Sequence, residues 1–136
     1  MATEKPSLDN VKKDLMPLVR HAVVAYGSWC TSHFSRRSDI DIAVISMERS
    51  HPANLKLFQK LLGSAPERYD IKVFELLPLT VQISIIENHK TIFGGELEIS
   101  EYFYHYRKLW KDVRGRIAEN QFSSATEKLA RRMSFA

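Results

Sequence analysis

Two aspartates, Asp39 and Asp41, lie one residue apart inside the apolar run DIDIAVIS. Side chains alternate across a β-strand, so both carboxylates project from the same face of the strand. Like charges on an apolar sheet are costly unless a cation or hydrogen bonds compensate them. Paired carboxylates bind hard divalent cations such as Mg²⁺ through their oxygen atoms. The pair therefore predicts a metal site.

A third carboxylate, Asp70, lies in a second segment with strand character, RYDIKVFELL, where apolar residues alternate with Asp70 and Lys72. If the two strands are neighbours, three carboxylates converge, as in sites that hold two Mg²⁺ ions roughly 3.5–4 Å apart for phosphoryl transfer. The sequence thus predicts Asp39, Asp41 and Asp70 as the carboxylates of a metal-dependent catalytic site.

A glycine–serine pair, Gly27 and Ser28, precedes the aspartates by a loop. A glycine lets the backbone approach a phosphate closely, and the serine hydroxyl and nearby N–H groups can bind phosphate oxygens. An ordinary turn at the end of a strand uses the same residue types. Because the two aspartates follow, we expect Gly27 and Ser28 to bind a phosphate group.

Strands are expected over HAVVAYGS, DIDIAVIS and RYDIKVFELL, because these segments are rich in β-branched and aromatic residues and end at turn signals. The second strand should direct Ile40, Ile42 and Val44 into the core. Its opposite face, with Asp39, Asp41 and Ala43, should form the site. The segment KTIFGG is interpreted as a short strand or a turn.

Helices are expected after Ser7, which can accept a hydrogen bond as an N-cap, after Ser50, where Pro52 lies near the helix start, and again from Pro78. A longer helix is expected over residues 98–118, and the last stretch, SSATEKLARRMSFA, should form a separate partner-dependent helix or fray. The apolar stripe of the helix after Ser50 is predicted to consist of Leu55, Phe58, Leu61 and Leu62.

A chain of 136 residues, 44% hydrophobic and 26% charged, has the size of one compact domain. The N-terminus, MATEKPSLDN, is polar, and no run of about 18 apolar residues occurs. We therefore expect a cytoplasmic protein that does not enter a membrane. The single cysteine, Cys30, has no partner for a disulfide or a metal site and is interpreted as a small loop residue.

The formal net charge of +4 at pH 7 is carried by the C-terminal segment. Residues 1–99 contain 12 basic and 12 acidic side chains, whereas residues 100–136 contain 8 and 4. This excess is too small to indicate direct nucleic-acid binding, and a solvated helix face accounts for it. The same segment carries an aromatic group that fits either a helix core or a protein interface: Tyr102, Phe103, Tyr104, Tyr106 and Trp110.

The pair Gly27-Ser28, ten intervening residues and Asp39-Ile40-Asp41 resemble the GS-x10-DxD signature of the polymerase-β-like nucleotidyltransferases, in particular their smallest members, the minimal nucleotidyltransferase (MNT) proteins. YDIKVFELLPL is similar to the segment following the third carboxylate in MNT-type antitoxins, and IFGG with YFYHYRKLWKD to their C-terminal part. The resemblance covers about residues 10–115. It implies an α/β (α+β) fold with a small mixed sheet flanked by helices, as one minimal nucleotidyltransferase domain over residues 1–136 with a helical segment at 98–136.

The resemblance also implies a Mg²⁺-dependent enzyme, with two ions, that transfers a nucleotidyl group from ATP. Gly27 and Ser28 would hold the triphosphate, Asp39 and Asp41 would bind Mg²⁺, and Asp70 would be the third acid, which helps to activate the acceptor hydroxyl. MNT antitoxins are paired with HEPN-type RNase toxins and attach AMP to a toxin tyrosine, so a cognate HEPN toxin is the expected partner. A homo-oligomer and a hetero-oligomer with the toxin are both open.

One position departs from the resemblance: Ser32 lies where many members have glycine, four residues after the motif serine. Nearby charges have two interpretations. Arg36 and Arg37 are either solvated or salt-bridged loop residues or contacts to phosphate. Lys72 is either an ion-pair partner of Asp70, which we favour, or a phosphate contact.

Two other functions are compatible with these residues. The protein could be a non-catalytic antitoxin that binds and occludes the toxin, or a nucleotidyltransferase that modifies a small molecule such as an aminoglycoside. The three intact acids argue against pure occlusion, which needs none of them. The short chain argues against the second function, since small-molecule transfer usually requires added substrate-binding structure.

Overall fold

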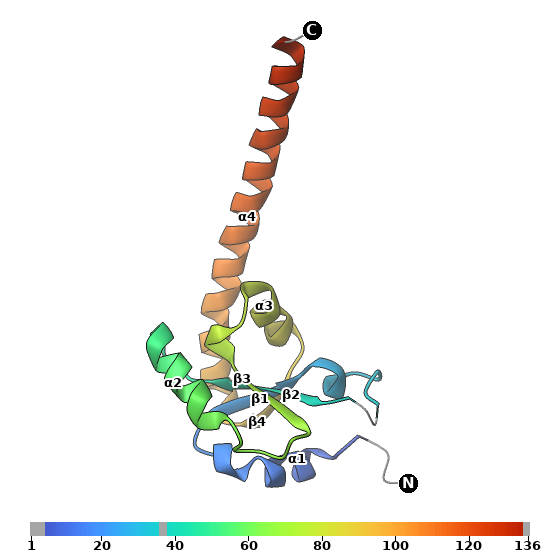
Figure 1. Cartoon of the computed structure of the whole chain (residues 1–136), viewed down its shortest axis with the longest axis vertical. Helices are drawn as coiled ribbons and strands as arrows, with labels where there is room; N and C mark the ends of the chain where they lie inside the picture. Colours follow the sequence, from blue (N-terminus) through green and yellow to red (C-terminus); the bar gives the residue numbers. More distant parts are fainter. Residues whose placement is uncertain (1–4, 36–37, 135–136) are drawn as a thin grey trace.

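The computed structural model describes residues 5–35 and 38–134, with side chains as far as residue 117. Helices and strands follow one another along the chain (Figure 1). With η denoting a short 3₁₀ helix, the elements are α1 (Leu8–Asp14), η1 (Met16–Leu18), β1 (Ala22–Tyr26), η2 (Gly27–Cys30), β2 (Ile40–Ile45), α2 (His51–Leu61), β3 (Tyr69–Val73), η3 (Phe74–Leu76), α3 (Leu79–Glu87), β4 (Lys90–Phe93) and α4 (Glu96–Ser134).

The four strands form one mixed sheet in the order β3-β2-β1-β4. Strand β1 pairs antiparallel with both β2 and β4, whereas β2 and β3 are parallel. A parallel pair needs a crossover connection, and α2 lies in the connection between β2 and β3. The expected mixed sheet flanked by helices is confirmed.

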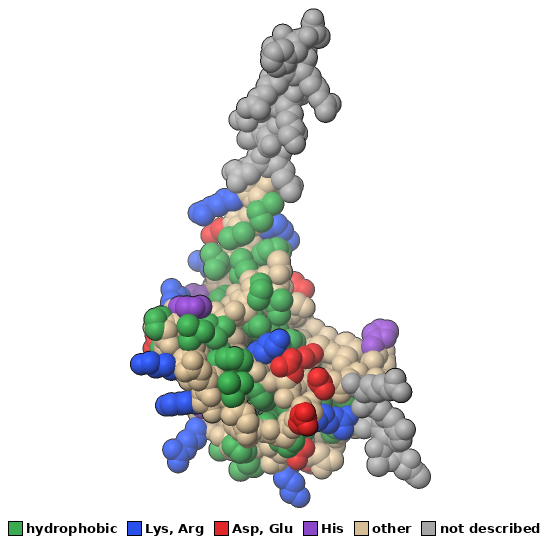
Figure 2. All heavy atoms as spheres, in the orientation of Figure 1, with side chains coloured by type: hydrophobic (Ala, Val, Ile, Leu, Met, Phe, Trp, Pro, Cys, Tyr) green, Lys and Arg blue, Asp and Glu red, His purple; other side chains and the backbone are tan. Residues whose placement is uncertain are grey.

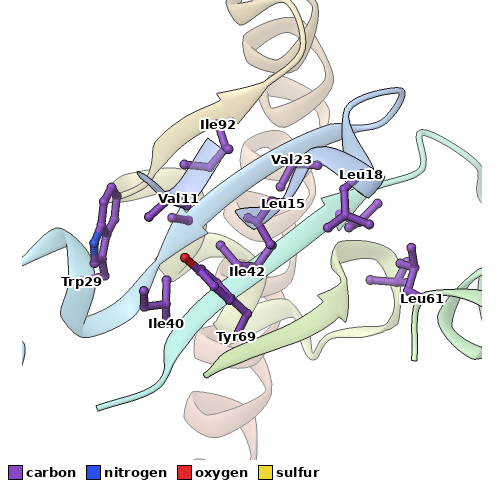
Figure 3. Packing of buried hydrophobic residues seen from close by; sticks show 13 residues of the cluster. Val11, Leu15, Leu18, Val23, Trp29, Ile40, Ile42, Leu61, Tyr69 and Ile92 are labelled. Carbon is purple, nitrogen blue, oxygen red and sulfur yellow. The ribbon is translucent and has the colours of Figure 1, made fainter. Parts of the chain in front are cut away.

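One face of the sheet packs against α1, η1 and the end of α2, and Figure 3 shows these buried side chains. Ser7 caps α1 by accepting a hydrogen bond from the N–H of Asn10 at 3.2 Å. Val11 of this helix and Leu15 at its C-cap are fully buried, and each such side chain contributes about 1.5–3 kcal/mol to folding. Ile40, Ile42 and Val44 of β2 point into this core, as the alternation predicts.

The opposite face of the sheet packs against α3 and α4. The expectation that Ala43 belongs to a site on this face of β2 is wrong, because Ala43 is buried beneath these helices together with Ile45. Phe74 fills the space between the sheet and α4, with its ring centroid 5.0 Å from that of Phe103. On this second face, Asp41 near the beginning of β2 is half-buried.

Helix α2 begins after its N-cap Ser50, as expected, but its apolar stripe differs from the prediction. Leu55 and Leu62 are 43% and 64% exposed, whereas Asn54 is buried. The Asn54 amide donates to the Glu48 carbonyl at 2.8 Å and its side-chain oxygen accepts from the Ser46 hydroxyl. A polar side chain with both groups satisfied can take a core position that periodicity alone would give to leucine.

Helix α4 runs without interruption from Glu96 to Ser134. The expected boundary between a helix over residues 98–118 and a separate final segment is therefore wrong for the described backbone, which ends at residue 134. The first turns of α4 pack on the sheet, and the rest extends away from it (Figure 1). Within the described ranges, neither this helix nor any other is both long and apolar enough to cross a membrane.

Candidate active site

Asp41 and Asp70 are direct neighbours in the parallel ladder between β2 and β3. Residues paired in this way project to the same face of a sheet, so the two carboxylates lie side by side. On the other flank of Asp41, the antiparallel partner in β1 is Tyr26. The order across the sheet is therefore Asp70, Asp41 and Tyr26, on the face that also carries α3.

Asp39 precedes the first residue of β2, and its side chain is exposed. It shares the face of Asp41 by alternation but is not fixed by the ladder. Among the residues that the structure describes, no group of three or more His, Cys, Asp or Glu side chains is placed to hold a metal ion. The structure thus brings Asp41 and Asp70 together, and the role of Asp39 stays a prediction.

The Asp41 carboxyl carries an electrostatic cost. Burial raises its pKa above the ordinary value, and the neighbouring Asp70 raises it further. Lys72 opposes this by lowering the pKa, and Asp39 adds a smaller increase. Lys72 Nζ lies 3.6 Å from Asp70 Oδ2, with both side chains 44% exposed, so the favoured ion pair is confirmed. A bound cation at this edge of the sheet would offset the repulsion between Asp41 and Asp70 that the exposed Lys72 does not neutralise.

Gly27 begins the turn η2 directly after β1, with a φ of +74° that favours glycine. An added Cβ atom there would clash with Oδ2 of Asp41. The turn backbone therefore lies against the carboxylate itself. The expected association of the Gly27–Ser28 turn with the aspartates is present in the geometry.

Turn η2 is anchored on both sides. Trp29 is buried in the core, and its indole N–H donates to the Pro6 carbonyl at 3.0 Å. The N–H and hydroxyl of Thr31 both donate to the Ser28 carbonyl at 3.0 Å. Cys30 is half-buried, with Sγ 3.3 Å from the Ala25 carbonyl, which agrees with its interpretation as a small loop residue. These contacts hold residues 27–31 in one conformation.

The backbone conformation of residue 32 does not require the glycine that many members have there. Among the described residues other than glycine, positive φ occurs at Met47, so Ser32 adopts a conformation that any residue can take. Arg36 and Arg37, considered as phosphate contacts or salt-bridge partners, lie outside the described residues.

A groove of about 520 Å³ borders Tyr26 and Gly27, between η2 and α3. Sequence reasoning missed it, because α3 was recognised only as a short helix. The signal was the spacing of Thr80, Ser84 and Asn88, which recur every fourth residue and so share one face of the helix. The polar lining of this groove lies beside the acidic pair.

Tyr26 was also missed as a neighbour of the site. Burial raises its pKa to about 12, with further increases from Asp41 and Asp70. Its phenol is therefore neutral at physiological pH and can donate a hydrogen bond. Figure 2 shows acidic side chains gathered near basic ones on one face of the molecule.

Comparison with known protein families and sequences gives two findings. The family model described as "Polymerase beta, Nucleotidyltransferase" matches residues 18–97. A candidate protein adenylyltransferase of Methanocaldococcus jannaschii is 45% identical over 113 residues, covering 83% of this chain and 88% of the relative. The family match includes the turn, the acidic pair and the residues that line the groove.

Two solved structures share the fold. A toxin–antitoxin crystal structure with AMP-PNP contains a chain with a TM-score of 0.60 at 18% identity, covering 77% of this chain and 90% of that chain. The structure of a tri-AMPylated Shewanella oneidensis HEPN toxin in complex with an MNT antitoxin contains a second similar chain. Its TM-score is 0.57 at 16% identity, and the match covers 81% of this chain and 92% of that chain. At these identities the likeness shows a common architecture.

Proposed function

Because the chain belongs to the polymerase β nucleotidyltransferase family and is a nucleotidyltransferase, we propose that it transfers AMP from ATP to a hydroxyl group of a partner protein. The proposed acceptor is a tyrosine of a cognate HEPN-type toxin, so that the protein acts as an antitoxin. Two facts support this proposal: the M. jannaschii relative is named for protein adenylylation, and the two structural neighbours are toxin–antitoxin complexes.

The observation that carries the proposal is the pairing of Asp41 with Asp70 beside the Gly27 turn. In the proposed reaction, the acceptor oxygen attacks the α-phosphorus of ATP and forms a new P–O bond. The bond from the α-phosphorus to the bridging oxygen breaks, and pyrophosphate leaves. Asp70 accepts the proton of the acceptor hydroxyl, a general-base role that a partly exposed carboxylate can fill.

The carboxylate pair fits Mg²⁺ in its chemistry. Mg²⁺ in phosphoryl-transfer sites is bound through one or two carboxylates, with substrate phosphates and water completing the shell. Asp41 and Asp70 would supply protein ligands, and Asp39 would be a further ligand from its exposed position before β2. The bound ions would neutralise charge on the phosphates during transfer.

The turn would position the triphosphate. Gly27 has no side chain to separate the backbone from a ligand, and its neighbour Ser28 supplies a hydroxyl at the same turn. Because η2 is anchored through Trp29 and Thr31, it would need little reorganisation on binding. The anchored turn would thus position the α-phosphate beside Asp41.

The acceptor would be presented by the partner protein. We propose that residues 1–136 form one minimal nucleotidyltransferase domain and that α4 carries much of the docking surface. Tyr104, Leu109 and Ile117 of α4 are 59%, 49% and 46% exposed. Basic residues lie between them at Arg107 and Lys108. Exposed aromatic and aliphatic groups with surrounding positive charge suit contact with a partner that has an apolar, acid-flanked surface.

The proposal can be tested with purified protein, Mg²⁺ and the product of the neighbouring gene as the proposed partner. ATP labelled on the α-phosphate should leave label on the partner, and intact mass should rise in steps of one AMP unit. ATP labelled on the γ-phosphate is the matched control, because only phosphoryl transfer would retain that label. The Asp41→Asn variant should transfer none.

Three outcomes would contradict the proposal. Retention of γ-label would indicate a kinase. Label confined to small molecules would indicate a small-molecule nucleotidyltransferase. Neutralisation of the toxin by Asp41→Asn as efficiently as by the wild type, without AMP on the toxin, would indicate occlusion.

A further inference from the structure

We propose that Glu75 is a positioning residue for nucleotidyl transfer: its carboxylate fastens the ends of β2 and β3 together and so holds Asp41 beside Asp70. This inference rests on the proposed function, since it assigns a residue that supports the acidic pair without touching the reactants. Glu75 lies in η3, two residues after the last residue of β3.

The Glu75 carboxylate bridges the ends of two strands that are distant in sequence. Its Oε1 accepts a hydrogen bond from the backbone N–H of Ser46 at 3.1 Å, and its Oε2 accepts one from the N–H of Met47 at 2.9 Å. Ser46 and Met47 directly follow Ile45, the last residue of β2. Because Glu75 follows β3, these two bonds tie the end of β2 to the end of β3.

The backbone after β2 is shaped around this carboxylate. Met47 has a φ of +59°, a left-handed conformation that is strained for a residue other than glycine. In a turn that contains a left-handed residue, successive N–H groups can converge on one anion. The N–H groups of Ser46 and Met47 both donate to Glu75. The strain at Met47 therefore accompanies the contact, which favours a specific role for Glu75.

The bridge matters for the acidic pair because β3 lies at the edge of the sheet, where its paired neighbour is β2. The position of Asp70 therefore depends on the β2–β3 ladder. In this ladder Asp41 faces Asp70, and Val44 faces Val73 at the end that Glu75 fastens. A slip by one residue would turn one carboxylate to the opposite face of the sheet. Fixing the ladder just beyond Val44 and Val73 opposes such a slip.

Helix α4 braces the bridge. The Tyr102 hydroxyl donates to Oε2 of Glu75 at 2.7 Å, and the hydroxyls of Tyr102 and Tyr106 lie 3.2 Å apart. The chain after β3 thus passes beside α4 before it enters α3 (Figure 1). Hydrogen bonds linked in a chain strengthen one another. The carboxylate therefore joins β2, β3 and α4, and each bond should contribute to the position of the acidic pair.

A carboxylate suits this place better than an amide. Three donors point at its two oxygens, and both oxygens accept hydrogen bonds. Glutamine has one acceptor oxygen, so the NH₂ group in Glu75→Gln would face a donor and at least one bond would be lost. Tyr102→Phe removes the bond to α4 and keeps the bridge between the strands.

Two control variants accompany these changes. Glu67→Gln makes the same change of charge at an exposed residue before β3. Ser7→Ala removes the N-cap of α1, so it lowers stability at a place away from β2 and β3. Every variant is assayed at a temperature where thermal melts show that it is fully folded.

Three measurements separate positioning from stability. AMP transfer to the partner protein gives kcat and KM. Calorimetric titration with Mg²⁺, in the presence of a non-hydrolysable ATP analogue, gives the Kd of the metal. Hydrogen exchange reports the protection of the backbone amides of Asp41 and Asp70, which requires no reaction.

We expect Glu75→Gln to lower kcat about tenfold or more and to raise the Kd of Mg²⁺ about threefold to tenfold, with the KM for the partner unchanged. The amides of Asp41 and Asp70 should exchange faster. Tyr102→Phe should change kcat and the Kd of Mg²⁺ in the same direction by about twofold to fivefold. Both controls should keep the wild-type values.

Wild-type kcat and Mg²⁺ affinity in folded Glu75→Gln would overturn the proposal, because a residue that only stabilises the fold alters neither quantity in the folded protein. If Glu75→Gln does not fold, wild-type kcat and Mg²⁺ affinity in Tyr102→Phe would overturn it in the same way.

Failure of this proposal can be separated from failure of the proposed function. If the wild type transfers AMP and Glu75→Gln transfers it equally well, the proposed function stands and the role of Glu75 is wrong. If the wild type transfers no AMP, the proposed function fails. Weaker Mg²⁺ binding and faster exchange in Glu75→Gln would then still support Glu75 as the residue that positions the acidic pair.

Discussion

The carboxylate of Asp41 occupies the space that a side chain at residue 27 would need. A Cβ atom at Gly27 would clash with Oδ2 of Asp41 and lie 3.3 Å from its Cγ. The φ of Gly27 is +74°, a conformation that side chains disfavour. The turn proposed to hold phosphate and the acid proposed to hold metal therefore lie in direct contact. A substitution in either should disturb the position of the other.

Replacing Gly27 with alanine should abolish AMP transfer and lower stability by about 1–3 kcal/mol, because it combines backbone strain with displacement of Asp41. Gly63→Ala is the matched control: Gly63 has a φ of +77° and no atom within 4 Å of an added Cβ. That variant should lose about 1 kcal/mol and keep its activity. Chemical denaturation and the α-label assay would measure both. Wild-type transfer by Gly27→Ala would show that the contact does not matter.

Asparagine at Asp41 or Asp70 should lower the transfer rate by about 10³-fold or more, because each change removes a metal ligand and a charge. Asp41→Asn should also leave the fold intact or slightly more stable, since it relieves the repulsion that raises the Asp41 pKa. Transfer assays over a range of Mg²⁺ concentrations, together with thermal melts, would test both effects. Asp39→Asn should lose transfer to the same extent. Full rates at saturating Mg²⁺ in these variants would contradict the metal site.

Much of the sheet could be predicted because its signals are local. The alternation in β2 correctly placed Ile40 and Ile42 in the core and Asp41 on the other face. The pairing of Asp41 with Asp70 was anticipated only as a condition, since register between strands depends on contacts distant in sequence. The structure satisfies that condition through the parallel β2–β3 ladder.

The errors arose where tertiary contacts override periodicity. Asn54 is buried because its amide is satisfied by Glu48 and Ser46, so the stripe of α2 is rotated away from Leu55. The groove beside Tyr26 could not be seen, because it forms between a turn and a helix far apart in the chain. The continuity of α4 was missed since polar residues after residue 118 carry no core pattern.

Removing the Ser28 hydroxyl should weaken triphosphate binding modestly, by about threefold to tenfold, because the backbone donors of the turn remain. Ser28→Ala keeps the backbone carbonyl that accepts from Thr31, so the turn should retain its shape. Titration with a non-hydrolysable ATP analogue would measure the change. Unchanged affinity would indicate that the Gly27–Ser28 pair is an ordinary turn at the end of a strand and does not bind phosphate.

Alkaline pH should weaken the attachment of α4 to the sheet. Tyr102 donates to Glu75 at 2.7 Å, and Glu75 also accepts from the N–H groups of Ser46 and Met47. Burial and this bond raise the Tyr102 pKa above 10.0, so its contribution to stability is complete below pH 10.0 and is lost as pH rises further. Tyr102→Phe should cost about 1–2 kcal/mol at pH 8 and lose less stability than the wild type between pH 9 and about 11. Denaturant melts at each pH would measure this, and parallel pH curves would contradict it.

Docking of the toxin on α4 can be tested only with residues that the fold does not need. Tyr106 packs edge-on against Phe74 with ring centroids 5.0 Å apart, and Trp110 packs against the same core, so changing them would disturb folding. Tyr104 and Leu109 are 59% and 49% exposed and offer a cleaner test. The Tyr104→Ser, Leu109→Ser double variant should reduce AMP transfer to the toxin about tenfold or more while ATP binding stays unchanged.

Two companion variants make the outcome specific to α4. Leu62→Ser removes an equally apolar side chain that is 64% exposed after α2, and it should transfer normally. Truncation after Asn120 removes the basic residues Lys128, Arg131 and Arg132, so it should slow association with an acidic partner and reduce its dependence on salt. Circular dichroism would confirm folding, and stopped-flow association with the toxin at two salt concentrations would separate the charge effect from the apolar contact. If the double variant and the truncation both modify the toxin at the wild-type rate, α4 does not carry the docking surface.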